Sequence, residues 1–115
     1  MSQERRYYTR YSLRCDCILA YESGIKFNAE ILDISAEGAK IRIDTEIFIN
    51  PGDIVYLSIK CKYKIKIKAQ VRWVKKDKFT EVGLKFIEMS MQDRESLSQL
   101  ISEIAMANIS EIYLS

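Results

Sequence analysis

Apolar and polar residues alternate without a break from Val55 to Trp73, and this run constrains the fold more than any other feature of the sequence. Its odd positions are all apolar, a period of two that is typical of a β-strand with one buried face. The run is 19 residues long, which exceeds the usual length of a single strand. We therefore predict two strands joined by a hairpin near residues 61–63. With a loop of three residues, the apolar side chains of both strands stay at odd-numbered positions.

Shorter alternating runs lie on both sides of this hairpin, at residues 13–19, 25–31, 39–43 and 82–86. Turn-forming residues separate them, among them Glu22-Ser23-Gly24 and Asn50-Pro51-Gly52-Asp53. Six short strands bounded by turns predict an all-β barrel or sandwich. From Leu97 onward the apolar spacing becomes helical, and Ser90 with Asp93 has the pattern of a helix start. We expect this C-terminal helix to pack against the barrel, with a dimer or partner surface as the alternative.

The composition limits the class of protein. At 115 residues, 48% hydrophobic and 30% charged, the chain fits one globular domain. No apolar stretch approaches a membrane span or a signal-peptide core, so we expect a cytoplasmic protein. Cys15 and Cys17 share the inward parity of one strand, and with Cys61 they are predicted to be buried thiols rather than metal ligands or disulfide partners. Without histidine, paired carboxylates or a nucleophile beside a base, the sequence predicts no metal site and no enzyme.

Positive charge is concentrated in two regions, although the formal net charge is only +2. Residues 1–14 hold four Arg and one Glu, and residues 60–78 hold nine Lys or Arg and one Asp. The second region contains a ladder of alternating lysines: Lys60, Lys62, Lys64, Lys66 and Lys68. Such a ladder is typical of a solvated strand that resists edge pairing, and an acidic partner or nucleic acid is the alternative interpretation.

The segment Arg5-Arg6-Tyr7-Tyr8-Thr9-Arg10 precedes the first predicted strand. In an extended chain Arg6 and Arg10 lie on the same side, about 13 Å apart, so their long side chains can converge on one ligand. A guanidinium forms paired, charge-assisted hydrogen bonds with phosphate and with the O6 and N7 atoms of guanine. By itself, the segment fits a phosphate ligand, a general nucleic-acid contact or a solvated tail.

A second polar segment, Asp33-Ile34-Ser35-Ala36-Glu37-Gly38, joins two predicted strands. Asp33 offers an acceptor and Ser35 a hydroxyl, while Gly38 can adopt a positive φ or let a ligand approach the backbone. The same residue types are also typical of a turn in which the side chains cap neighbouring amides.

Together the two segments resemble the signature of the PilZ family of bacterial cyclic di-GMP receptors: Arg6-x-x-x-Arg10, a β-hairpin, then Asp33-x-Ser35-x-x-Gly38. The resemblance extends to the Pro51-Gly52 turn, Val71-Arg72-Trp73-Val74, the strand from Val82 to Phe86 and the helical tail. It implies a single domain in which a six-stranded antiparallel β-barrel of the split-barrel type, residues 12–90, follows a flexible ligand-binding arm, residues 1–11, and precedes a C-terminal helix, residues 91–115.

The resemblance also implies a ligand and its contacts. In PilZ receptors the two arginines bind phosphates and the Hoogsteen edge of guanine, the aspartate accepts from guanine N–H groups, and the serine contacts a phosphate. Cyclic di-GMP is then expected to bind Arg6, Arg10, Asp33, Ser35 and Gly38, with no cofactor and no catalysis. Arg5 is similar to arginines that accompany the binding of two stacked ligand molecules. Such receptors relay ligand binding to a protein partner in motility, surface polysaccharide and biofilm control.

Two functions of other classes stay open. A small basic β-barrel can bind single-stranded nucleic acid through its arm and its lysines, and a PilZ-like adaptor can bind a protein without any ligand. Near the motif, Trp73 has the inward parity and is predicted to lie in the core, with a place at the border of the ligand as the alternative. Arg72 is predicted to face outward.

Overall fold

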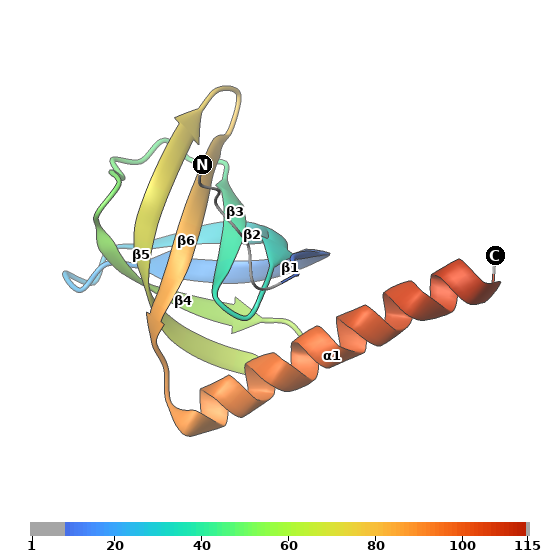
Figure 1. Cartoon of the computed structure of the whole chain (residues 1–115). Coiled ribbons are helices and arrows are strands. Elements are labelled where there is room, and N and C mark those ends of the chain that lie inside the picture. The colour runs from blue at the N-terminus through green and yellow to red at the C-terminus, as the bar shows by residue number, and fades with distance from the viewer. Residues whose placement is uncertain (1–8, 115) are drawn as a thin grey trace, which may run out of the picture.

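The structure, a computed structural model, describes the backbone of residues 9–114 and the side chains of residues 9–107. Six antiparallel strands precede one long helix, as the sequence predicts (Figure 1). The elements are β1 (Tyr11–Ala20), β2 (Lys26–Ile34), β3 (Gly38–Ile43), β4 (Ile54–Lys60), β5 (Lys64–Lys76), β6 (Thr80–Glu88) and α1 (Met91–Leu114).

The strands form a closed barrel in the order β1-β2-β3-β6-β5-β4, in which β4 returns to pair with β1. Each of the six strands thereby pairs with a neighbour on both sides. The long alternating run forms the β4–β5 hairpin, in which Lys60 pairs with Lys64 across a loop of residues 61–63. The predicted three-residue loop is therefore confirmed.

The interior of the barrel is filled by branched aliphatic side chains. Leu19, Ile41, Leu57 and Ile67 are each no more than 1% exposed, and they belong to four different strands. On β4, and on β5 as far as Val71, the odd positions face this core, while the lysines at even positions lie at the surface. The period of two in the sequence thus corresponds to the inner and outer faces of the barrel wall.

The position of Trp73 corrects the prediction made from its parity. Trp73 is 41% exposed, whereas Val71, two residues earlier, is 1% exposed. Val71 pairs with Leu84 but Trp73 pairs with Gly83, so β5 holds one extra residue at Arg72. A β-bulge of this kind reverses the faces on which the following residues lie. Trp73 therefore faces outward on the barrel, and Arg72 is exposed as predicted.

Helix α1 packs its first half against one end of the barrel, and its C-terminal end extends beyond it (Figure 1). Ser90 caps the helix, since its Oγ accepts a hydrogen bond from the Asp93 amide at 3.0 Å. Leu97 and Leu100 are buried in the barrel core. Farther along, the Tyr63 hydroxyl donates to Glu103 at 2.6 Å, and this bond is the main reason that the pKa of Glu103 is lowered. In the part of the chain that the structure describes, no helix is long and apolar enough to span a membrane.

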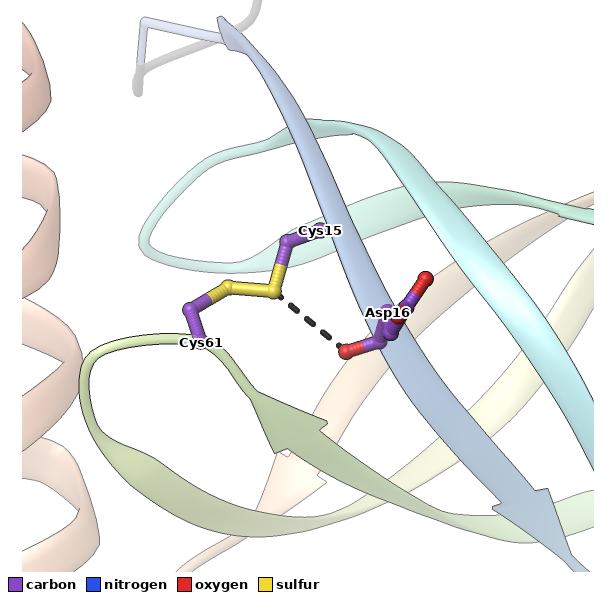
Figure 2. Close-up of a disulfide and its surroundings, with 3 residues drawn as sticks. All are labelled: Cys15, Asp16 and Cys61. Carbon is purple, nitrogen blue, oxygen red and sulfur yellow. Dashed lines mark hydrogen bonds between the residues drawn. A yellow bond between two sulfur atoms is a disulfide. The ribbon is translucent and has the colours of Figure 1, made fainter.

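Cys15 and Cys61 form a disulfide, so the prediction of buried thiols is wrong for these two residues (Figure 2). The β1–β4 register pairs Cys17 with Ile59, which brings Cys15 opposite the residue after β4. The two Cα atoms are 5.8 Å apart, within the range that a disulfide spans. Cys17 remains a free buried thiol, as predicted. Burial, with smaller effects from the nearby carboxylates of Asp16 and Glu30, raises its pKa from 9.0 to about 12.

Candidate ligand-binding site

The pairing of β1 with β2 brings the two polar segments together. Tyr11 lies opposite Ile34 and Ser12 opposite Asp33, so the residues just before β1 reach the C-terminal end of β2. Arg10 is the last residue before β1, and its Nη1 lies 2.6 Å from Asp33 Oδ1. Two residues that are 23 positions apart in the sequence thus form an ion pair on the barrel surface.

Asp33 has a second cationic neighbour that the sequence analysis missed. The Lys40 ammonium lies 3.8 Å from Asp33 Oδ2, because Lys40 is the β3 residue that pairs with Asp33. The tight connection between β2 and β3 fixes the pairing of Asp33 with Lys40. The sequence analysis missed this pairing because it assigned the end of β2 to the loop. In the structure β2 runs through Ile34 and includes Asp33. The site therefore has a carboxylate between a guanidinium and an ammonium.

Irregular pairing turns Asp33 toward the outside of the barrel. Ile31 is fully buried, and strict alternation would place Asp33 on the same inner face. Between these residues the β2–β3 register shifts by one, from Ile31 opposite Ile41 to Asp33 opposite Lys40. The extra residue in β2 turns Asp33 outward, where it can face a ligand, and leaves Ile34 in the core.

Ser35 holds the turn between β2 and β3. Its side chain is buried, and its Oγ accepts hydrogen bonds from the amides of Glu37 and Gly38, both at 3.2 Å. The Ser35 amide also donates to the Gly38 carbonyl at 2.8 Å. The interpretation as a capped turn is therefore confirmed for Ser35, while Asp33 pairs with side chains instead.

Gly38 is required by close packing and not by its backbone conformation. Among the described glycines only Gly24 and Gly52 have a positive φ. A Cβ at Gly38 would instead collide with the carbonyl oxygen of Leu84 on the neighbouring strand β6. A larger residue would thus separate β3 from β6 at the point where the turn begins.

The remaining predicted site residues, Arg5 and Arg6, lie outside the described residues. The structure therefore brings together Arg10, Asp33, Ser35 and Gly38 of the predicted set, at one end of β2 and β3. The lysine ladder belongs to other strands, on β4, β5 and the loop between them. In the part of the chain with described side chains, no group of three His, Cys, Asp or Glu residues is placed to hold a metal ion.

Comparisons with known proteins agree with this architecture. The chain matches the family model of the PilZ domain over residues 4–103. The structure of MotI/DgrA, the Bacillus subtilis inhibitor of motility, has a TM-score of 0.76 at 20% identity, and the match covers 91% of this chain and 53% of that one. The complex of K. pneumonia MrkH with c-di-GMP has a TM-score of 0.79 at 17% identity, and the match covers 95% of this chain and 56% of that one.

The chain thus spans about half the length of these two proteins. The PilZ domain of Escherichia coli YcgR, solved with c-di-GMP, is closer in size: the match covers 95% of this chain and 98% of that one, with a TM-score of 0.74 at 14% identity. No curated protein sequence matches the chain. Because the family model extends over most of the sequence and the barrel has the fold of these structures, the chain belongs to the PilZ domain family.

Proposed function

We propose that this chain is a receptor for cyclic di-GMP that has no catalytic activity. The observation that carries the proposal is the ion pair between Arg10 and Asp33, since it joins the two halves of the family signature in one place. The ligand offers phosphates and guanine edges, which are the groups that a guanidinium and a carboxylate recognise. The presence of c-di-GMP in the MrkH and YcgR structures supports this choice of ligand.

Ligand binding would exchange the Arg10–Asp33 contact for contacts with the ligand. The two side chains are 31% and 19% exposed, and a partly exposed ion pair contributes only about 0–1 kcal/mol. Opening it therefore costs little compared with the charge-assisted bonds that replace it. Arg10 would bind phosphate or the guanine Hoogsteen edge, Asp33 would accept from guanine N–H groups, and Lys40 would add positive charge beside both.

The relay to a partner is proposed to use the N-terminal arm, residues 1–11. Arg5, Arg6 and Arg10 belong to this arm, whereas Asp33, Ser35 and Gly38 belong to the barrel. A ligand held by both would dock the arm on the barrel and change the surface offered to a protein partner. Hydrogen exchange of residues 1–10 with and without cyclic di-GMP tests this step, and unchanged exchange would rule it out.

Calorimetric titration of the full chain with cyclic di-GMP tests binding. Removing one charge-assisted contact costs about 1.5–3 kcal/mol, so Arg10→Ala should weaken binding roughly 10- to 150-fold. Arg14→Ala is the matched control, because Arg14 lies only four residues farther along, on β1, but pairs with Glu30 and has a side chain that is 66% exposed. Equal loss in both variants, or no binding by the wild type, would contradict the proposal.

The same titrations separate the remaining alternatives. Arg5→Ala tests stoichiometry, because loss of a second ligand molecule should change the molar ratio and leave one site. A single-stranded oligonucleotide at several salt concentrations tests the nucleic-acid interpretation, which predicts strong, salt-dependent binding. Recovery of intact cyclic di-GMP after long incubation tests the absence of catalysis.

A further inference from the structure

The lysine ladder of the β4–β5 hairpin is not explained by the fold. Lysines on a strand usually keep an exposed edge from pairing with another chain. Here β4 pairs with β1 and β5, and β5 pairs with β4 and, from Lys68 onward, with β6. The part of β5 before Lys68 borders α1, where the Lys66 amide donates to Asp93 at 3.3 Å. Strand pairing and α1 thus already cover these edges, and the lysines are not needed for that purpose.

The arrangement of three of these lysines also works against folding. Lys60 lies directly opposite Lys64 in the β4–β5 register, and Lys66 follows Lys64 by two residues on the same outer face. We call these three exposed residues the lysine triad. Like charges at directly opposed positions of an antiparallel pair destabilise a sheet. A cluster that costs stability and protects no edge is a candidate binding surface for an anionic group.

Two other lysines of the ladder have acidic partners within the chain. The Lys62 ammonium lies 3.1 Å from Glu103 of α1, and the Lys68 ammonium lies 3.9 Å from Glu88 of β6. By contrast, no carboxylate among the described side chains lies within 4.0 Å of an ammonium group of the lysine triad. The three positive charges of the triad are therefore available to a partner.

Helix α1 shows which chemistry this hairpin accepts. Its Glu103 takes hydrogen bonds from the Lys62 ammonium at 3.1 Å and from the Tyr63 hydroxyl at 2.6 Å, both in the β4–β5 loop beside the helix (Figure 1). Residues four apart on a helix are separated by about 6 Å along its axis. Residues two apart on a strand, such as Lys64 and Lys66, are separated by about 6.6–6.8 Å. A second helix with carboxylates at that spacing therefore matches the triad.

We propose that the lysine triad is a docking surface for an acidic helix of a protein partner. This inference goes beyond the proposed function, because the triad lies on other strands than the candidate ligand site and needs no cyclic di-GMP. Single-stranded nucleic acid fits less well, since it stacks its bases on exposed rings, and Tyr56, the ring beside the ladder, is half-buried. Basic clusters that bind an anionic membrane usually hold about four to eight cations, more than the triad offers.

A titration of the full chain followed by backbone amide chemical shifts tests the surface, because it detects weak binding and locates it. The probe is a helical peptide of alanine and glutamine that carries Glu at positions i, i+4 and i+8. In the control peptide the same three Glu residues point to different sides of the helix. We expect the first peptide to shift residues 56–68 and salt to weaken its binding. Lys60→Gln/Lys64→Gln/Lys66→Gln should weaken binding roughly 3- to 150-fold, because three exposed ion pairs are lost.

Lys75→Gln/Lys76→Gln/Lys78→Gln is the matched control, because it removes the same charge from exposed residues at the far end of β5 and in the turn after it. We expect this variant to bind the peptide like the wild type. Equal loss in the two triple variants, or equal binding of the two peptides, would show an effect of net charge alone and overturn the proposal. A peptide that causes no shifts in the wild type would also overturn it.

Separate titrations with a single-stranded oligonucleotide and with vesicles that contain phosphatidylserine test the other partners. Binding of either one at the triad, together with no binding of the peptide, would show that the partner is not an acidic helix. The triad variant should bind cyclic di-GMP as the wild type does in calorimetry. Failure of the docking surface thus leaves the receptor intact, and a wild type that binds the peptide but not cyclic di-GMP refutes only the receptor.

Discussion

Reduction of the disulfide between Cys15 and Cys61 should lower the stability of the barrel by about 4 kcal/mol. The two residues are 46 positions apart, and closing a loop of that length removes about 13.5 cal/mol/K of entropy from the unfolded chain in the chain-entropy model. At 25 °C this entropy corresponds to about 4 kcal/mol. With a urea dependence of about 2 kcal/mol/M, the unfolding midpoint should fall by roughly 2 M.

The assay is urea unfolding followed by the fluorescence of Trp73, with and without a thiol reductant. The starting state is checked by counting thiols in denaturant, where one of the three cysteines reacts if the disulfide is intact. The double variant Cys15→Ala/Cys61→Ala is the matched control, because a reductant should not move its midpoint. Equal midpoints for oxidised and reduced wild-type protein would refute the reasoning.

The disulfide also has a local effect that hydrogen exchange can measure. Cys61 begins the β4–β5 loop, and the next two residues, Lys62 and Tyr63, both contact Glu103 on α1. The bond to Cys15 therefore fixes the loop that holds the middle of the helix. Reduction should increase exchange in residues 61–63 and near Glu103 more than in the centre of the barrel, where pairing on both sides protects the strands.

Three further predictions concern the core and the turn. Gly38→Ala should destabilise the domain by about 1–3 kcal/mol in urea unfolding, because the new Cβ meets the Leu84 carbonyl, which is rigid backbone; unchanged stability would show that β3 and β6 can separate freely. Leu19→Ala, at a fully buried position, should cost about 3 kcal/mol by the same measurement, and a loss below 1 kcal/mol would contradict the packing. Burial raises the pKa of the Cys17 thiol from 9.0 to about 12. As the pH rises between these two values, the free energy of unfolding should therefore fall by up to about 1.4 kcal/mol per pH unit, because only the unfolded thiol ionises in this range. Cys17→Ala should lack this part of the decrease. Identical profiles of stability against pH for the variant and the wild type would disprove the reasoning.

The sequence predicted the strands, the β4–β5 loop and the helix start because these depend on local patterns. A period of two identifies a strand wherever one face is buried. Ser90 caps α1 through a hydrogen bond from the Asp93 amide, which is only three residues away in the sequence. The disulfide was missed because it depends on barrel closure. Cys15 lies opposite Cys61 only when β4 pairs with β1, and nothing local to either cysteine specifies that pairing.

The face of Trp73 was predicted wrongly and Asp33 was assigned to a loop, and the outward positions of both residues have one physical cause. Asp33 and Trp73 both follow buried residues at a spacing of two, Ile31 and Val71, and simple alternation assigns both to the core. In each case one extra residue in the strand shifts the register and turns the side chain outward. Asp33 then forms ion pairs with Arg10 and Lys40, and the Trp73 indole lies over Gly83. Asp33 pairs with Lys40, Lys40 with Gly83 and Gly83 with Trp73, so the two shifts place both side chains on one outer surface of the barrel. A bulge is encoded by packing across strands and not by neighbours in the chain. The motif therefore selected Asp33 as a candidate site residue from the sequence, whereas its neighbour Lys40 required the structure.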